Sequence, residues 1–171
     1  MKTLMIMRHA RSSWDDSSLA DFDRPLNKRG KEAASFMGKF LAGKGLTVDL
    51  ILSSPAKRAK ETAELVKQAA NWSTPVEFND HIYEASPQTL YSILSKVNDE
   101  LVSLMIVGHN PGMEGFVKLL TGKLVAMSTA SVALVEFDVD VWSRIEPGAG
   151  QLIDVCRPKE LETKSHKSEQ N

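Results

Sequence analysis

Short apolar runs alternate along the chain with segments in which apolar residues recur every three or four positions. Three runs are almost continuously apolar, at residues 3–7, 48–52 and 103–107. Runs of this length and character are typical of strands that are buried on both faces of a parallel sheet. The pattern therefore predicts three central strands at these positions.

The segments between the apolar runs have the periodicity of helices that pack on one face. In residues 28–42 the apolar positions are three or four apart, and Asn27 before them is a suitable N-cap. Residues 56–70 follow Pro55, which favours the first turn of a helix. The remaining predicted helices cover residues 87–96 and 111–120, and the remaining predicted strands cover residues 76–78, 132–137 and 151–156. We expect the strands at 132–137 and 151–156 to be antiparallel strands at the edge of the sheet.

Two polar segments complete the pattern. Residues 12–28 contain four aspartates and Pro25 and are predicted to form a surface loop. Residues 158–171 are nearly all polar, and we expect them to form a mobile C-terminal tail after a single domain of residues 1–157. Alternating strands and helices predict an α/β fold for that domain, a three-layer α/β/α sandwich with a mostly parallel central sheet.

The overall composition is that of an ordinary globular domain of 171 residues, with 42% hydrophobic and 25% charged residues. Its net charge of −1 gives no reason to expect binding to nucleic acid or to a membrane surface. No apolar stretch reaches the length of a membrane span. The single cysteine, Cys156, excludes an intrachain disulfide and suits a reducing compartment, so we expect a cytoplasmic protein in which Cys156 is a buried structural residue.

Cationic and imidazole side chains follow each of the three apolar runs. Arg8 and His9 come directly after the first run, and Arg58 lies shortly after the second. His109 follows the third. Because the carboxyl ends of parallel strands meet at one edge of a sheet, we expect these side chains to lie close together. So many basic groups in one cleft are unfavourable without a counter-ion, and the pattern therefore indicates an anion site.

The residue types suit a phosphoryl group in particular. Guanidinium groups donate pairs of hydrogen bonds to phosphate oxygens, and backbone N–H groups at a helix start bind them as well. Residues 108–112 (Gly-His-Asn-Pro-Gly) provide such a strand-to-helix turn. A histidine in this place could act as a base, a metal ligand or a nucleophile. Neither His9 nor His109 has a second histidine or a carboxylate at the spacing of a metal site, so we expect no metal and no cofactor.

These motifs, in this order, resemble those of the histidine phosphatase superfamily, the phosphoglycerate-mutase-like group. Its hallmark after the first strand is Arg-His-Gly, which stands here as Arg8-His9-Ala10, so the turn has to accept a Cβ atom. With the following residues 11–14 (Arg-Ser-Ser-Trp), this variant is similar to the small SixA-like phosphohistidine phosphatase branch. The resemblance spans about residues 2–157 and includes two further motifs, at residues 53–62 and 108–112.

The resemblance implies a phosphatase in which His9 is the nucleophile that takes the phosphoryl group and then passes it to water. Arg8, Arg58 and His109 would hold the phosphoryl oxygens and stabilise the charge of the transition state. Further contacts with the substrate are expected at the rim of the site, from Ser12, Lys57 and Asn110.

The resemblance also suggests a proton donor. Glu84 stands at the position of the family's general acid, and an exposed carboxylate at the start of a helix is the alternative interpretation of this residue. Asp15 stands where the family often has an asparagine that contacts phosphate. Because the charge of a carboxylate would repel phosphate, we assign no such role to Asp15.

The segment between the second and third predicted helices bears on the substrate. Mutases and small-molecule phosphatases of this superfamily usually carry a long insertion after the second motif, which covers the site, whereas here the segment from Ala70 to Pro87 is short. An open site suits phosphohistidine on a protein, with inorganic phosphate as the product. A small phosphomonoester is the alternative substrate, and a non-catalytic phosphate-binding module is the alternative of another class. Binding alone would not require a nucleophile such as His9.

Overall fold

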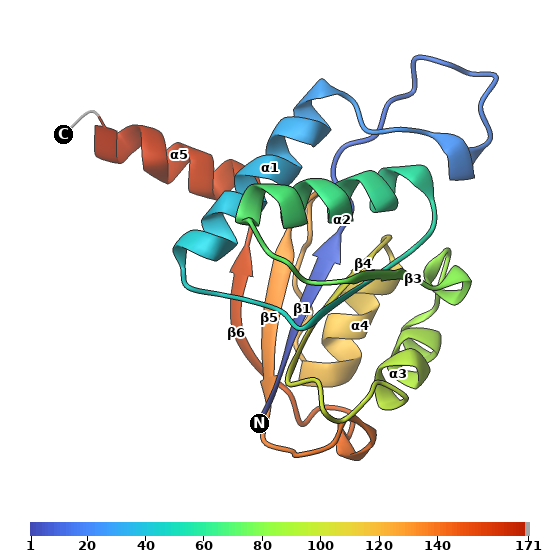
Figure 1. Cartoon of the computed structure of the whole chain (residues 1–171), viewed down its shortest axis with the longest axis vertical. Helices are drawn as coiled ribbons and strands as arrows, with labels where there is room; N and C mark the ends of the chain where they lie inside the picture. The colour runs from blue at the N-terminus through green and yellow to red at the C-terminus, as the bar shows by residue number, and fades with distance from the viewer. Residues whose placement is uncertain (170–171) are drawn as a thin grey trace.

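A computed structural model describes residues 1–169, with side chains described up to Lys164. Its centre is a six-stranded sheet in the order β3-β2-β4-β1-β5-β6 (Figure 1). The first four strands in this order are parallel, and β5 is antiparallel to both of its neighbours. The strands are β1 (Lys2–Arg8), β2 (Leu50–Ser53), β3 (Val76–Phe78), β4 (Ser103–Gly108), β5 (Val132–Phe137) and β6 (Gln151–Cys156).

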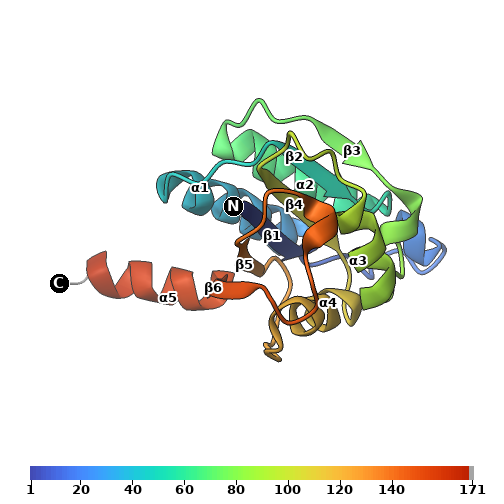
Figure 2. The ribbon, with the colours of Figure 1, turned by 90° about the horizontal axis from the view of Figure 1, so that it is seen from below.

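Helices cover both faces of the sheet, as Figure 2 shows. The helices α1 (Lys28–Gly43) and α2 (Lys57–Ala70) pack on one face, and α3 (Pro87–Ser95) and α4 (Gly112–Thr121) pack on the other. Successive side chains of a strand point to opposite faces, so Met5 of β1 joins the core beneath α1 and α2 while Leu4 joins the core beneath α3 and α4. The predicted three-layer α/β/α sandwich is thereby confirmed.

The local signals in the sequence place two helix starts correctly. The side chain of Asn27 accepts a hydrogen bond from the backbone N–H of Gly30 at 2.7 Å and so caps α1. Helix α2 begins at Lys57, two residues after Pro55. Within the predicted surface loop, residues Asp21–Asp23 form a short 3-10 helix, η1, and Ser12 forms an isolated bridge with Leu26.

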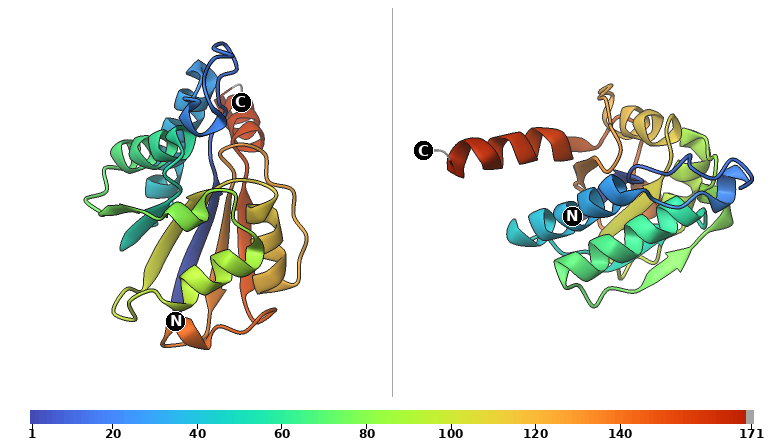
Figure 3. Two further views of the ribbon diagram at one scale, coloured as in Figure 1. Left: turned by 90° about the vertical axis from the view of Figure 1, so that its right-hand side faces the viewer. Right: turned by 90° about the horizontal axis from the view of Figure 1, so that it is seen from above.

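The structure corrects one expectation near the C-terminal end of the chain and adds a helix there. Strand β5 is not an edge strand, because it lies between β1 and β6; of the two strands expected at an edge, β6 alone lies there. Within the polar tail, residues Pro158–Glu169 form a helix, α5, which projects away from the sheet (Figure 3). Proline suits the first position of a helix, and Leu161 packs against the core beside α1. Residues 170 and 171 of the expected tail lie outside the described part.

Among residues 1–169, no helix combines the length and the apolar composition that crossing a membrane requires. The single cysteine, Cys156, is free and buried in β6, as expected of a structural residue. Burial raises the pKa of its thiol to about 11, so the thiol stays protonated near neutral pH.

Candidate active site

The carboxyl ends of β1, β2 and β4 meet at one edge of the sheet. The pairing of Arg8 with Gly108 places the residues that follow them, His9 and His109, side by side. The backbone N–H of His9 donates to the carbonyl oxygen of Gly108 at 2.9 Å, and that of Ser54 donates to Val107 at 3.0 Å. A cavity of about 730 Å³ opens at this edge, and its walls include all four side chains predicted to converge: Arg8, His9, Arg58 and His109.

The imidazole of His9 is held in one orientation. His9 is buried, and its Nδ1 atom lies 2.6 Å from the carbonyl oxygen of Ala10. A carbonyl oxygen only accepts hydrogen bonds, so Nδ1 carries the proton and Nε2 keeps its lone pair. Burial, reinforced by the charges of Arg58 and Arg8, lowers the pKa of His9 to about 4. The ring is therefore neutral near pH 7, with an unprotonated Nε2.

Two arginines are anchored at the same cavity through their terminal nitrogens. Nη1 of Arg8 donates to the carbonyl oxygen of Met127 at 3.0 Å, and Nη1 of Arg58 donates to that of Asp21 at 2.7 Å. The Nε atoms of Arg8 and Arg58 are buried and have no hydrogen-bond partner. In each guanidinium group, the edge that includes Nε therefore lacks an acceptor on Nε. Such an edge is a planar pair of donors of the kind that binds an oxyanion.

The second histidine lies against the first. The ring centroids of His9 and His109 are 5.0 Å apart, and Nε2 of His109 lies 2.8 Å from the hydroxyl oxygen of Ser54. That oxygen also accepts the backbone N–H of Ala56, which leaves the hydroxyl proton free to be donated to Nε2. In this arrangement the buried Nδ1 of His109, which has no partner, is an N–H donor. Burial, with His9 and Arg58 nearby, lowers the pKa of His109 to about 3.

Ala10 stands where the superfamily usually has glycine, and the turn after β1 accommodates its Cβ atom. Ala10 is fully buried in the core cluster beneath α1 and α2. Its backbone N–H donates to the hydroxyl of Thr62 at 3.0 Å, and that hydroxyl donates to the carbonyl oxygen of Arg58 at 2.7 Å. Thr62 thus ties the turn that carries His9 to the first turn of α2, which carries Arg58.

The remaining predicted residues differ in their positions. Ser12 and Asn110 line the cavity, but the side chain of Asn110 is already bound to Glu114 and to the carbonyl oxygen of Met127, both at 3.0 Å. Lys57 is exposed and is not among the lining residues. Asp15, to which no phosphate contact was assigned, is exposed at the cavity mouth.

Glu84 is exposed and also lies outside the lining of the cavity. Its backbone has a φ of 54°, in the left-handed region that residues other than glycine seldom adopt. The preceding residue, Tyr83, contacts the site directly, because its ring lies edge-on to that of His109 with a centroid separation of 5.5 Å. Glu84 is therefore next to the site in the chain, without forming its wall.

Two residues of the site, Asp21 and Arg24, were missed by the sequence analysis. Arg24 is buried, stacks on the ring of Trp14 at 3.5 Å and donates to the hydroxyl of Ser12 at 2.7 Å. Asp21 accepts hydrogen bonds from both Arg24 and Arg58. The available signal was that Arg24 is the only basic residue of the aspartate-rich segment 12–27.

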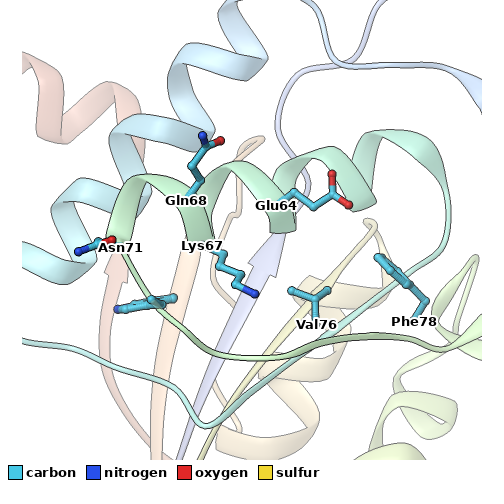
Figure 4. Close-up of a pocket in the computed structure, with 7 residues that line it drawn as sticks. Glu64, Lys67, Gln68, Asn71, Val76 and Phe78 are labelled. Atoms are coloured by element: carbon cyan, nitrogen blue, oxygen red, sulfur yellow. The ribbon is translucent and has the colours of Figure 1, made fainter.

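A second cavity, of about 580 Å³, lies between α2 and β3 (Figure 4). Its lining residues are Glu64, Lys67, Gln68, Asn71, Trp72, Val76 and Phe78. None of them is a histidine or an arginine, so this cavity lacks the groups that phosphoryl transfer requires. Among the described residues, no three His, Cys, Asp or Glu side chains gather closely enough to hold a metal ion.

Comparisons with known proteins agree with this geometry. The model of the histidine phosphatase superfamily (branch 1) matches residues 4–101. An uncharacterized chloroplastic protein of Arabidopsis thaliana is 33% identical, over 92% of this chain and 78% of its own length. The phosphohistidine phosphatase SixA of Escherichia coli is 27% identical, over 79% of this chain and 85% of its own length.

The architecture is shared with solved structures as well. The structure of the protein histidine phosphatase SixA complexed with tungstate has a TM-score of 0.81 at 24% identity, covering 93% of this chain and 99% of that one. The predicted phosphoglycerate-mutase-like fold is thereby confirmed, and the family match covers more than half of the chain. The chain belongs to the histidine phosphatase superfamily and is a phosphatase with a catalytic histidine.

Proposed function

We propose that this phosphatase removes the phosphoryl group from phosphohistidine on proteins and that it works without a metal, through a phosphorylated His9. One observation carries the proposal: Nδ1 of His9 is bound to the carbonyl oxygen of Ala10, which leaves Nε2 unprotonated beside Arg8 and Arg58. A neutral imidazole next to fixed cations is suited to attack a phosphorus atom and to bear the phosphoryl group afterwards.

In the first step, the Nε2 lone pair of His9 forms a bond to phosphorus while the bond from phosphorus to the substrate nitrogen breaks. The electron pair of that bond leaves with the imidazole, which takes up a proton from the solvent. Arg8, Arg58 and Nδ1–H of His109 bind the three phosphoryl oxygens as negative charge spreads over them. The negative charge of the phosphoryl group also favours the protonated form of both histidines, and so opposes the lowering of their pKa by burial and by the nearby arginines.

In the second step, water attacks the phosphorus atom and the bond from phosphorus to Nε2 breaks. Inorganic phosphate leaves, the water proton passes to the solvent, and His9 returns to its neutral form. The two arginines supply the positive charge that a bound metal ion supplies in other phosphatases. For an ester substrate the leaving oxygen requires a proton, and we propose Glu84 as its donor.

The surroundings of the cavity support a substrate carried on a protein. Trp14 lies at the cavity wall with 76% of its surface exposed, and the exposed side chains of Arg11 and Arg29 line the same opening. Aromatic and arginine side chains of this kind are enriched where proteins bind one another. The name of the Escherichia coli relative, a phosphohistidine phosphatase, is consistent with this class of substrate. We further propose that the protein acts in the cytoplasm.

A substrate panel tests the proposal. The purified protein is incubated with a histidine-phosphorylated carrier protein, with free phosphohistidine and with an aryl phosphate, and kcat/KM is measured for each. We expect the carrier protein to give the highest kcat/KM. An equal or higher kcat/KM for the aryl phosphate would assign the site to small phosphomonoesters, and phosphate binding without turnover of any substrate would indicate a binding module.

A further inference from the structure

We propose that Asp21 is a positioning residue that orients Arg58 for the phosphoryl group, and that Tyr83 holds Asp21 in place. The inference rests on the proposed function of the site. Asp21 accepts two hydrogen bonds from Arg58, one from Nη1 to its backbone oxygen at 2.7 Å and one from Nη2 to its carboxylate at 3.0 Å. The loop that carries Asp21 is distant in the chain from α2, which carries Arg58, so the contact is purely tertiary.

Whether Asp21 and a phosphoryl group can both bind Arg58 depends on which edge of the guanidinium group Asp21 occupies. A guanidinium group offers one pair of donors at its end, Nη1 and Nη2, and another along its side, which includes Nε. Asp21 binds Arg58 from the end. Nε of Arg58 is buried and has no hydrogen-bond partner, so Asp21 leaves the side edge without an acceptor. Asp21 and a phosphoryl group can therefore bind Arg58 at the same time.

The carboxylate of Asp21 is itself held by several donors. The hydroxyl of Tyr83 donates to it at 2.6 Å, and Arg24 donates through Nη2 at 3.1 Å and through Nε at 3.3 Å. The bond from Tyr83, and then those from the two arginines, hold the pKa of Asp21 well below its usual range, so the carboxylate stays charged. Asp21 thus joins Tyr83, Arg24 and Arg58 into one network.

Tyr83 also connects this network to the second histidine of the site. Its ring lies edge-on both to His109, at a centroid separation of 5.5 Å, and to Phe22, at 5.2 Å. Phe22 belongs to η1 together with Asp21. The hydrogen bond and the ring contacts therefore fix η1 against the cavity wall, which keeps the carboxylate of Asp21 at the end of Arg58.

A different arrangement would make Asp21 a competitor, an internal anion that has to leave before phosphate binds. The two possibilities predict opposite effects of removing its charge. If Asp21 positions Arg58, Asp21→Asn weakens the binding of phosphate. If Asp21 competes, the same substitution strengthens it. Asp23 provides the matched control, because it lies in the same 3-10 helix, is exposed and carries the same charge.

The test measures the dissociation constant of inorganic phosphate by calorimetry, and kcat and KM for an aryl phosphate, for the wild type, Asp21→Asn and Asp23→Asn. We expect Asp21→Asn to weaken phosphate binding roughly ten-fold and to lower kcat/KM by at least as much, since it removes a charge-assisted hydrogen bond from Arg58. Asp23→Asn should match the wild type. Tighter phosphate binding in Asp21→Asn, or values equal to those of Asp23→Asn, would overturn the proposal.

Tyr83→Phe provides a second variant that keeps the ring and removes only the hydroxyl. We expect it to weaken phosphate binding by about two- to five-fold, and Tyr83→Phe should add little to Asp21→Asn because both act through the same carboxylate. Fully additive effects would show that the two residues act separately and would contradict the network. If the wild type itself neither binds phosphate nor turns over any phosphorylated substrate, the proposed function fails, which is a distinct result.

Discussion

The Nδ1 atom of His9 lies 2.6 Å from the carbonyl oxygen of Ala10, the next residue in the chain. Because the acceptor belongs to the adjacent peptide group, the contact depends on the local turn and not on a distant side chain. It fixes the proton on Nδ1 and leaves Nε2 unprotonated, which is the nitrogen that attacks in the proposed mechanism. The same turn is held by the bond from the backbone N–H of Ala10 to Thr62, on the helix that carries Arg58.

The protonation state of His9 can be measured directly. Since burial lowers the pKa of His9 to about 4, we expect NMR of its ring nitrogens to show a neutral, Nδ1-protonated imidazole from pH 8 down to about pH 5. Its titration should have a midpoint near pH 4, and added inorganic phosphate should raise that midpoint. A midpoint near the ordinary value of 6.5 without phosphate, or a proton on Nε2, would contradict this account of the site.

The same pKa values have a consequence for folding stability. Below about pH 6.5 the histidines of the unfolded chain are protonated, while His9 and His109 in the folded chain remain neutral down to about pH 4 and 3. The unfolded state then binds more protons, so the free energy of unfolding should fall as the pH decreases from 6.5 to 4. Urea denaturation at a series of pH values measures this slope, which should be smaller in His109→Asn. An unchanged slope in that variant would show that His109 is not buried in its neutral form.

The arginines of the site should not tolerate replacement by lysine. Arg58→Lys keeps the positive charge but loses the planar pair of donors, so we expect kcat to fall by roughly 10²-fold, in line with the loss of one oxyanion donor. Steady-state kinetics with an aryl phosphate measure the effect. Arg144→Lys, an exposed substitution in the 3-10 helix Trp142–Arg144, serves as the control and should leave kcat unchanged. A kcat for Arg58→Lys within two-fold of the wild type would show that the charge alone is sufficient.

Glu84 should matter only for one kind of leaving group. An alkoxide needs a proton as it leaves, whereas the imidazole of phosphohistidine leaves readily once its nitrogen is protonated. We therefore expect Glu84→Gln to lower kcat for an alkyl phosphate by roughly ten-fold or more and to leave the turnover of phosphohistidine within about two-fold. Equal losses on both substrates, or no loss on either, would remove Glu84 as the proton donor.

Two glycines of α1 form a matched pair for the packing of this helix on α2. A Cβ atom on Gly38 would lie 2.5 Å from the carbonyl oxygen of Val66, whereas one on Gly43 would meet nothing within 4 Å. We expect Gly38→Ala to lower the free energy of unfolding by roughly 1–3 kcal/mol through overpacking. Gly43→Ala should be neutral or slightly stabilising. Denaturant unfolding measures both, and equal stabilities would show that the two helices separate freely at Gly38.

The convergence of Arg8, His9, Arg58 and His109 could be predicted because each side chain follows a buried strand or begins a helix directly after one. In a parallel sheet, this local position determines the position in space. Asp21 and Arg24 could not be found in this way. They lie in a long loop whose path depends on contacts with α2 and with Tyr83, far away in the sequence.

A similar reason explains why the sequence did not predict the helix at the C-terminus. The polar composition of residues 158–171 predicted a mobile tail, because few apolar residues were available to bury. Helix α5 begins at Pro158, where the missing N–H of proline costs nothing, and a single apolar residue, Leu161, packs against the body of the protein. A helix that buries only one apolar residue has no apolar periodicity of three or four positions, so the sequence pattern does not reveal it.

Whether His9 carries the phosphoryl group during turnover can be decided by detecting that group on its ring. The protein is mixed with a small phosphoramidate, quenched rapidly in alkali and analysed by mass spectrometry, beside His9→Ala and the exposed control His81→Ala. We expect an acid-labile phosphoryl group on Nε2 of His9 in the wild type and in His81→Ala, and none in His9→Ala. Equal labelling of His9→Ala and the wild type would contradict this expectation.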